Sequence, residues 1–206
     1  LLTLEDDALR KIRGACIAMI FQEPMTSLNP VFSIGEQIVE ALQLHNPELS
    51  DEEAKSQAID ALDQVQIKSA ATRFDDFPHQ LSGGQRQRVM IAMALACKPD
   101  LLIADEPTTA LDVTVQAEIL ELMRNLQTQK GMAILFITHD FGVVAQMAHQ
   151  VGVMQNGKLV EQGLTKEVLA NPQHAYTQKL LASVPENLAK SAVDTAAYDS
   201  EAPVLV

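Results

Sequence analysis

The sequence is poor in basic residues, in cysteine and in long hydrophobic runs. Its 15 Lys and Arg face 27 Asp and Glu, for a net charge of -12, so it lacks the basic stripe with which nucleic-acid binders neutralise phosphates. Cys16 and Cys97 have no metal-ligand spacing, and we expect both to be small buried hydrophobic residues. The longest apolar run, residues 89–97, is about half the length of a membrane span. With no signal peptide, we expect a reducing, cytoplasmic setting.

What the sequence does contain is the composition of an ordinary globular domain. Of its 206 residues, 47% are hydrophobic and 20% are charged, close to the average for such domains. A chain of this length can bury roughly 70% of its unfolded surface, so a core can form without disulfide bonds. The length fits one domain, or one core with a small inserted subdomain.

The first part of the chain combines one strand pattern with several helical patterns. Residues 5–13 are typical of a short polar helix, residues 15–21 of an apolar strand, and residues 24–30, rich in Pro, Ser and Asn, of a loop. Helical periods follow, and Ser50 with Glu53 forms a capping box that opens one of these helices. A small helical subdomain is therefore expected at about residues 30–80.

The pattern then changes to that of an α/β protein. Short apolar runs at residues 101–104 and 132–137 do not alternate, which is typical of parallel strands covered on both faces. A helical period that starts after Asp112 lies between them. The sequence thus predicts a β-α-β unit with a right-handed crossover.

A hairpin and a short helix are expected near the C-terminus. Residues 151–154 and 158–162 flank Asn156-Gly157, which predicts a type I′ turn. A helix is expected at residues 176–183. The tail from Pro185 has no periodicity, and we expect it to be mobile.

Two acidic residues directly follow the apolar run at residues 101–104. Asp105 and Glu106 stand where the carboxyl end of a parallel strand meets the ligand crevice of an open α/β sheet. One carboxylate there can hold Mg²⁺, and a second can position or deprotonate a water. A strand followed by a polar turn with Pro107 explains the same residues without any chemistry, so alone they leave both interpretations open.

The segment Leu81-Ser-Gly-Gly-Gln85 opens another helix. Ser82 and Gln85 form a capping box, which by itself indicates only a well-started helix. Gly83 and Gly84 each cost about 1 kcal/mol relative to alanine inside a helix, and capping does not require that loss. Close approach of the helix N-terminal amides to an anion does require it, so we expect an anion at this turn.

Two further polar residues follow apolar strands. His139 comes soon after the run at residues 132–137 and is expected at the same sheet edge as Glu106, unlike the other histidines, which we interpret as structural. Gln22 ends the first strand, where a neutral amide can sense a metal ion or a water. Each of these signals is weak alone.

Together and in this order, these residues resemble the nucleotide-binding domain of ATP-binding cassette (ABC) transporters. Gln22 matches the Q-loop, and the Leu81–Gln85 pentapeptide matches the signature sequence. Leu101–Glu106 matches the Walker B strand with its catalytic glutamate, Ala110-Leu111-Asp112 the D-loop, and His139 the switch histidine. The resemblance implies an α/β fold, with an incomplete P-loop NTPase-type parallel sheet core and an inserted α-helical signature subdomain.

This resemblance extends from about Leu1 to Gly163, and a finer one rests on longer segments. Phe21–Pro30, Pro78–Gly84, Ala104–Asp112 and Asn171–Thr177 look like the ATPases of oligopeptide, dipeptide and nickel importers. The finer resemblance implies an ATPase subunit that powers import of peptides or related solutes. It also implies a second nucleotide-binding domain, as a homo- or heterodimer, transmembrane permease subunits and, indirectly, a solute-binding protein. The implied location is peripheral, at the cytoplasmic face of the inner membrane, with no nucleic-acid partner.

The resemblance implies a role for each site residue, with ATP and Mg²⁺ as cofactors. Asp105 holds Mg²⁺ with Gln22 near the metal or the water, Glu106 orients or deprotonates the attacking water, and His139 contacts the γ-phosphate. The signature turn faces the ATP of the opposite subunit in a head-to-tail dimer, whose seam Asp112 crosses. The residues expected to bind the nucleotide are Gln22, Ser82, Gly83, Gly84, Gln85 and Asp112.

One element of the family is not found in the sequence. No G-x-x-x-x-G-K-[ST] phosphate loop occurs, the first residue is not Met, and only 21 residues precede Gln22, so we expect an N-terminally truncated chain. Because the phosphate loop supplies most contacts to the β- and γ-phosphates, we expect this chain alone to bind ATP poorly and to be inactive. An exposed sheet edge and apolar face are expected too.

The predicted domain boundaries follow the motifs. Residues 1–24 form core up to the Q-loop, residues 25–84 the helical subdomain, residues 85–170 the core with Walker B, D-loop and switch histidine, and residues 171–206 a C-terminal extension with a tail. Two alternatives stay open. One is an ABC-type ATPase of DNA repair or translation outside any transporter, although the basic surfaces, coiled coils and zinc cysteines typical of those proteins are not found. The other is a non-catalytic fragment.

Overall fold

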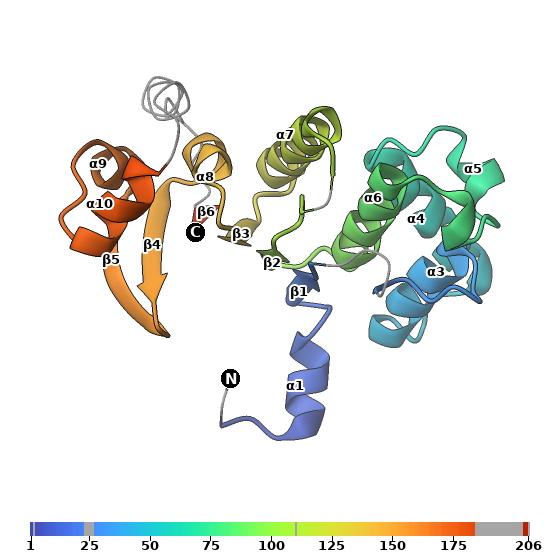
Figure 1. Cartoon of the computed structure of the whole chain (residues 1–206). Coiled ribbons are helices and arrows are strands. Elements are labelled where there is room, and N and C mark those ends of the chain that lie inside the picture. The colour runs from blue at the N-terminus through green and yellow to red at the C-terminus, as the bar shows by residue number, and fades with distance from the viewer. Residues whose placement is uncertain (2, 23–26, 110, 184–203, 206) are drawn as a thin grey trace. The chain divides into compact units, whose positions relative to one another are not determined.

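The computed structural model describes residues 1, 3–22, 27–109, 111–183 and 204–205. The chain divides into two compact units, residues 1–123 and residues 124–206. The boundary falls inside helix α7 (Val113–Lys130) (Figure 1). Within the described residues, the search found no helix with the length and apolar character needed to cross a membrane.

Unit 1 contains a parallel pair of strands, β1 (Ile17–Ile20) and β2 (Leu101–Asp105). Their register joins Ile17 to Leu101 and Ile20 to Ala104. The two strands therefore end level with each other, although a long stretch of sequence separates them. Whatever follows each strand emerges at one shared edge, which is the geometry a ligand crevice needs.

Burial along these strands differs from the expectation of two covered faces. In β1, Ala18 and Ile20 are buried, whereas Met19 between them is 39% exposed. In β2, Leu102 and Ala104 are buried and their neighbours are half-buried. The expectation of double coverage is thus wrong for β2 within the described residues, because Leu101 and Ile103 are only half-buried. Met19 and Phe21 leave an exposed apolar face along β1, as expected.

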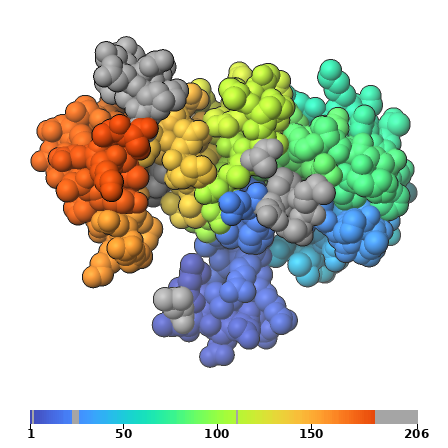
Figure 2. All heavy atoms as spheres, viewed as in Figure 1, coloured from blue at the N-terminus to red at the C-terminus, as the bar shows by residue number. Residues whose placement is uncertain are grey.

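Several helices of unit 1 begin at N-terminal capping boxes. Ser33 with Glu36 and Ser50 with Glu53 form complete capping boxes, and the second of these confirms a prediction from the sequence. Helices α3, α4 and α6 pack against one another, whereas α1 projects from the rest of its unit (Figure 2). The helices are α1 (Asp6–Ile12), α3 (Ile34–His45), α4 (Asp51–Gln64), α5 (Ala70–Arg73), the 3₁₀ turn η1 (Pro78–Gln80) and α6 (Gly83–Leu95).

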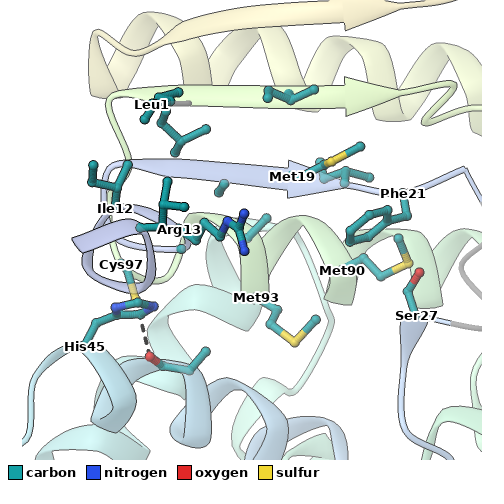
Figure 3. Close-up of a pocket in the computed structure, with 18 residues that line it drawn as sticks. Leu1, Ile12, Arg13, Met19, Phe21, Ser27, His45, Met90, Met93 and Cys97 are labelled. Atoms are coloured by element: carbon teal, nitrogen blue, oxygen red, sulfur yellow. Dashed lines mark hydrogen bonds between the residues drawn. The ribbon is translucent and has the colours of Figure 1, made fainter. Parts of the chain in front are cut away.

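An apolar hollow with a volume of about 1150 Å³ runs along β1. Figure 3 shows His45 and Cys97 at one end of it and Phe21 and Met90 at the other. The residues predicted to bind the nucleotide do not line it. Cys97 is half-buried, its Sγ donates to the carbonyl of Ala41 at 3.5 Å, and burial raises the pKa of the thiol.

The prediction of two buried cysteines is wrong for Cys16. This residue is exposed, in the turn that leads into β1. Its carbonyl accepts hydrogen bonds from the amides of Asp100 and Leu101, so its backbone helps to set the register of β1 and β2.

After the last part of α7, unit 2 contains β3 (Ala133–Ile137) and α8 (Phe141–Met147) and continues into a hairpin. Strands β4 (Gln150–Gln155) and β5 (Lys158–Leu164) pair antiparallel around Asn156 and Gly157. Both turn residues have positive φ, 51° and 74°, as a type I′ turn requires. The hairpin prediction is confirmed.

The tail was expected to be mobile, but the structure places Val204–Leu205 in a strand. These residues form β6, which pairs in parallel with β3 and with Gln150 of β4. A short apolar segment can add to the open edges of two strands even without any periodic signal. Residues 185–203 lie outside the described residues.

Two short helices, α9 (Thr165–Ala170) and α10 (Ala175–Ala182), complete unit 2. Val144, Val151, Val153 and Val168 form a buried cluster against which Tyr176 packs. The Glu161 carboxylate accepts hydrogen bonds from the amides of Gln173 at 2.7 Å and His174 at 3.1 Å. Its negative charge therefore lies at the N-terminus of α10, where the helix dipole favours it.

Candidate functional site

The ends of β1 and β2 bring Gln22 and Glu106 together. Each residue lies two positions beyond the register pair Ile20–Ala104, so the strand pairing carries both side chains to the same place. Gln22 Nε2 donates to Glu106 Oε2 at 2.8 Å. The Thr109 hydroxyl donates to the same oxygen at 2.9 Å. The structure thus unites two of the predicted site residues and adds Thr109, which sequence reasoning missed although its spacing from Glu106 is that of a local turn.

Glu106 has a left-handed backbone, with φ of 44°. A left-handed conformation costs roughly 1–2 kcal/mol for a residue with a Cβ. The residue before a proline is also restricted to extended conformations, and Pro107 follows here. Strain of this kind persists where neighbouring bonds hold it, typically at functional sites. The bonds from Gln22 and Thr109 hold this carboxylate.

Asp105 is the last residue of β2 and is half-buried. With the Glu106 carboxylate and the Gln22 amide, it gives the strand ends an oxygen-rich set of possible ligands. Mg²⁺ prefers oxygen and is commonly bound by one or two carboxylates, waters and substrate phosphates rather than by a full protein cage. The search for clusters of His, Cys, Asp and Glu found none of three or more among the described residues. The donor set therefore fits a shared site of this kind and does not form a closed metal cage.

The signature turn has the geometry expected of a capped helix start. Ser82 Oγ accepts from the amide of Gln85 at 3.3 Å, and Gln85 Oε1 accepts from the amide of Ser82 at 2.9 Å. This capping box confirms the predicted start of α6. Gly83 is exposed, and the nearest atom to a Cβ built there would be Leu111 Cδ2 at 3.9 Å. The amide end of α6 is thus accessible at Gly83.

Gly84 differs from Gly83, since it lies against helix α7. A Cβ built at Gly84 would come within 2.7 Å of Val115 Cγ1, closer than any normal contact. Packing between the helices thus gives Gly84 a structural reason, and its expected place near an anion stays a prediction. The site of contact is the first turn of α7, where Asp112 Oδ1 accepts from the amide of Val115 at 3.0 Å. Asp112 is thus a helix cap, and Ala110 lies outside the described residues.

His139 belongs to unit 2, in the turn that follows β3. Its side chain is exposed. The turn is fixed by Thr138 Oγ1, which accepts from the amide of Asp140 at 3.0 Å, and by Asp140 Oδ1, which accepts from the amide of Gly142 at 2.7 Å. Asp140 thereby caps α8. That His139 and Glu106 share a ligand crevice stays a prediction, because they lie in different units.

Solved structures define the class of this fold. The chain is similar to the ATP-binding cassette MJ0796 in a dimeric, post-hydrolysis state bound to ADP and Pi, with a TM-score of 0.69 and 31% identity over 79% of this chain and 68% of that one. It is also similar to cbiO1 from Clostridium perfringens, part of the ABC transporter complex cbiONQ, with a TM-score of 0.71 and 30% identity over 91% of this chain and 71% of that one. The fold is that of the α/β ABC cassettes, as the sequence predicted.

Family comparisons then place the chain. Residues 3–109 match the ABC transporter family, and residues 160–203 match the C-terminal region of oligopeptide/dipeptide transporters. The chain belongs to the ABC transporter family. The predicted resemblance to the importer branch for oligopeptides and dipeptides is confirmed by the second match.

Named relatives point the same way. The chain is 58% identical over 186 residues to the glutathione import ATP-binding protein GsiA of Escherichia coli K12, which covers 90% of this chain. It is 58% identical over 181 residues to GsiA of Salmonella choleraesuis, which covers 88% of this chain. The chain spans about 30% of the length of these curated relatives.

Proposed function

We propose that this chain is part of the ATP-binding and ATP-hydrolysing subunit of an ABC importer for peptides or related solutes such as glutathione. The observation that carries the proposal is the hydrogen bond of 2.8 Å between Gln22 and Glu106. A register set by apolar strands places an amide and a carboxylate together at the edge where α/β sheets bind ligands. A purely structural turn does not need a strained glutamate at that point.

The residues divide the chemistry between them. Asp105 would hold Mg²⁺, directly or through water, with the oxygen of Gln22 toward the metal or the attacking water. Glu106, whose carboxylate is fixed by Gln22 and Thr109, would orient or deprotonate that water. His139 would contact the γ-phosphate. ATP would supply the reacting phosphoryl group and Mg²⁺ would neutralise its negative charge, while the protein supplies position and electrostatics.

The signature turn faces the ATP of a second nucleotide-binding domain in this proposal. The turn consists of the four residues Ser82 to Gln85. Asp112 lies at the start of the neighbouring helix α7. The exposed amide end of α6 at Gly83 supports an anion there, because a helix N-terminus carries partial positive charge. A phosphate loop elsewhere in the assembled protein completes the site.

The helical region, which is the predicted helical subdomain at residues 25–84, supplies a surface for the permease. The amide of Ile34 donates to the carbonyl of Asp76 at 2.9 Å, so the loop before α3 and the loop before η1 lie together. These loops carry exposed Val31, Phe32 and Phe77, with 72%, 48% and 37% of their surfaces accessible. Apolar side chains exposed in one region are typical of an interaction surface. A peripheral position at the cytoplasmic face of the inner membrane follows from this docking.

The transported solute belongs to the peptide class in this proposal. The match of residues 160–203 to the oligopeptide/dipeptide transporter region supports import over an ATPase of DNA repair or translation. The relatives named for glutathione import make that tripeptide the first solute to test. The solute-binding protein and the permease select the solute, and this chain powers its passage.

The Glu106→Gln variant tests the proposal in vesicles that contain the whole subunit bearing this segment, its permease and its binding protein. We expect ATP binding to persist while hydrolysis and glutathione uptake fall by about 10²-fold or more. Asp100→Asn, an exposed residue before the opposite end of β2, is the matched control and should leave both rates unchanged. Steady hydrolysis by Glu106→Gln would remove the glutamate from its role. Hydrolysis without uptake of any peptide by the unaltered protein would refute the import assignment.

A further inference from the structure

Arg88 is a buried cation one helical turn beyond the signature turn. It lies on α6 and is only 9% exposed. Its Nη1 donates to the carbonyl of Val65 and to Gln66 Oε1, both at 3.1 Å, and its Nη2 donates to Glu118 Oε2 at 3.0 Å. Removing a charge from water is costly unless partners replace the solvent. This guanidinium therefore connects the end of α4 to α7.

The partner at the end of α4 is itself unusual. The helix ends at Gln64, Val65 is its C-cap, and Gln66 takes a left-handed conformation with φ of 62°, where glycine is the common choice. The last carbonyls of a helix carry partial negative charge. Arg88 meets that charge by bonding both the Val65 carbonyl and the Gln66 side chain. The Arg88 guanidinium thus fixes the end of α4 to α6, and the same group also reaches Glu118 on α7.

Helices α6 and α7 make two contacts, one turn apart, which we call the first and second layer. The first layer is the close packing of Gly84 against Val115. The second is the ion pair between Arg88 and Glu118, one turn further along both helices. Because Asp112 bonds the amide of Val115, the first layer is directly connected to the start of α7. A shift of α6 therefore moves the beginning of α7 as well.

We propose that Arg88 is a positioning residue that couples the helical region to Asp112, by holding the end of α4, helix α6 and helix α7 as one body. The inference rests on the proposed function, in which the helical region docks on the permease and Asp112 faces the second subunit. A signal that moves the docked helices then reaches α7 through the guanidinium. The flat fork of arginine reaches acceptors on two elements from two separate nitrogens, whereas the compact ammonium of lysine donates from a single point.

Glu118 offers the cleaner test, because its side chain is 56% exposed and Arg88 keeps its acceptors at Val65 and Gln66 when Glu118 is removed. The Glu118→Ala variant of the whole subunit is assembled with its permease in vesicles. The measured quantity is the ratio of ATP hydrolysis with loaded binding protein to hydrolysis without it. This ratio does not depend on the fraction of active protein, so simple destabilisation leaves it unchanged. We expect it to fall about fivefold or more, the range of a modest coupling between sites.

Glu121→Ala is the matched control, since Glu121 is an exposed acid on the same helix. It should keep the full ratio. Arg88→Lys should lower the ratio as Glu118→Ala does, and the double variant should be no worse than Arg88→Lys alone, because both changes break one connection. A melting curve for each variant confirms that it folds.

The outcomes separate the inference from the function beneath it. An unchanged ratio in Glu118→Ala, with normal hydrolysis in the unaltered protein, overturns the coupling role of Arg88 and leaves the proposed function standing. Fully additive losses in the double variant overturn it as well. If the unaltered protein neither hydrolyses ATP nor responds to the binding protein, the proposed function itself fails.

Discussion

Gln22 Nε2 lies 2.8 Å from Glu106 Oε2, across the ends of two parallel strands. The side chains meet because the register of β1 and β2 continues past the strands and carries both residues to the same level. Thr109 bonds the same carboxylate oxygen from the turn beyond. A carboxylate with two donors on one oxygen has a defined orientation, and orientation is what positioning a nucleophilic water requires.

Removing these donors should loosen the carboxylate. In the assembled transporter, we expect Gln22→Ala and Thr109→Val each to slow ATP hydrolysis about tenfold while ATP binding is retained. The double variant should be slowed by less than the product of the two, since both donors orient one group. Thr109→Ser keeps the hydroxyl and should hydrolyse normally. Loss of ATP binding in either single variant would contradict this account.

The strained backbone at Glu106 predicts a reversal of the usual order of glycine and alanine. Both Glu106→Gly and Glu106→Ala remove the carboxylate, but only alanine retains the penalty of positive φ. The free energy of unfolding of the glycine variant should therefore exceed that of the alanine variant by about 1 kcal/mol. Urea unfolding of the purified chain measures the difference. Equal stabilities would show that the left-handed backbone does not persist in solution.

The two glycines of the signature turn should respond oppositely to alanine. Gly83→Ala meets its nearest neighbour at 3.9 Å, and better helix propensity should stabilise the chain by about 0.5–1 kcal/mol. Gly84→Ala places a methyl group 2.7 Å from Val115 Cγ1, and overpacking should destabilise it by about 1–3 kcal/mol. Thermal and urea unfolding of the two variants provide the comparison.

Val115→Ala provides the control for the second change. In its background, Gly84→Ala should lose most of its destabilising effect, because the clashing methyl groups are gone. If Gly84→Ala were equally damaging with and without Val115, the contact between the helices would not be its cause. In the assembled transporter, Gly83→Ala should still impair hydrolysis despite its stability, because its methyl group lies at the accessible amide end.

The Glu161 carboxylate should make the start of α10 sensitive to acid. Burial acts to raise the pKa of Glu161, but hydrogen bonds from the Thr177 side chain and from the amides of Gln173 and His174, with the charge of His174, lower it below the ordinary 4.5. A carboxylate with a lowered pKa contributes its stability above its unfolded pKa and loses it as the pH falls through the folded pKa. The effect should thus be complete at neutral pH and be lost progressively as the pH falls below about 4.5 and through the lowered pKa of the folded state.

Hydrogen exchange at the amides of Gln173 and His174 measures this contribution locally. At about pH 7, Glu161→Gln should speed exchange by an amount that corresponds to about 1 kcal/mol, and under acid conditions the two proteins should converge. Glu167→Gln, an exposed residue of α9, is the control and should change neither value. A difference that persists in acid would assign the effect to packing and not to charge.

Local chemistry made much of this fold predictable. Capping boxes at Ser50 and Ser82 fix helix starts through bonds within one turn, and the Asn156-Gly157 pair fixes the hairpin through the backbone freedom of two residues. The grouping of Gln22 with Glu106 was predictable as well, because parallel strands end at one edge. These features depend on residues close in sequence or on a general rule of sheet geometry.

Features that depend on distant neighbours were not predictable in the same way. The exposure of Cys16 and the uncovered second face of β1 are set by what packs there and not by the apolar run itself. The packing of Gly84 against Val115 was not predicted, because nothing in the glycine's own turn reveals Val115. The left-handed backbone of Glu106 has no signal in the sequence, since an acid before a proline is normally extended.

The parallel pairing of β1 with β2 also determines where the chain can change in length. Residues between the strands can be inserted or deleted without moving Gln22 relative to Glu106, because the register joins only the strands themselves. One extra residue inside β1 or β2 would instead shift that pair and turn the following side chains to the other face. Loops between the intervening helices can therefore vary in length, while the pairing of β1 with β2 keeps Gln22 beside Glu106.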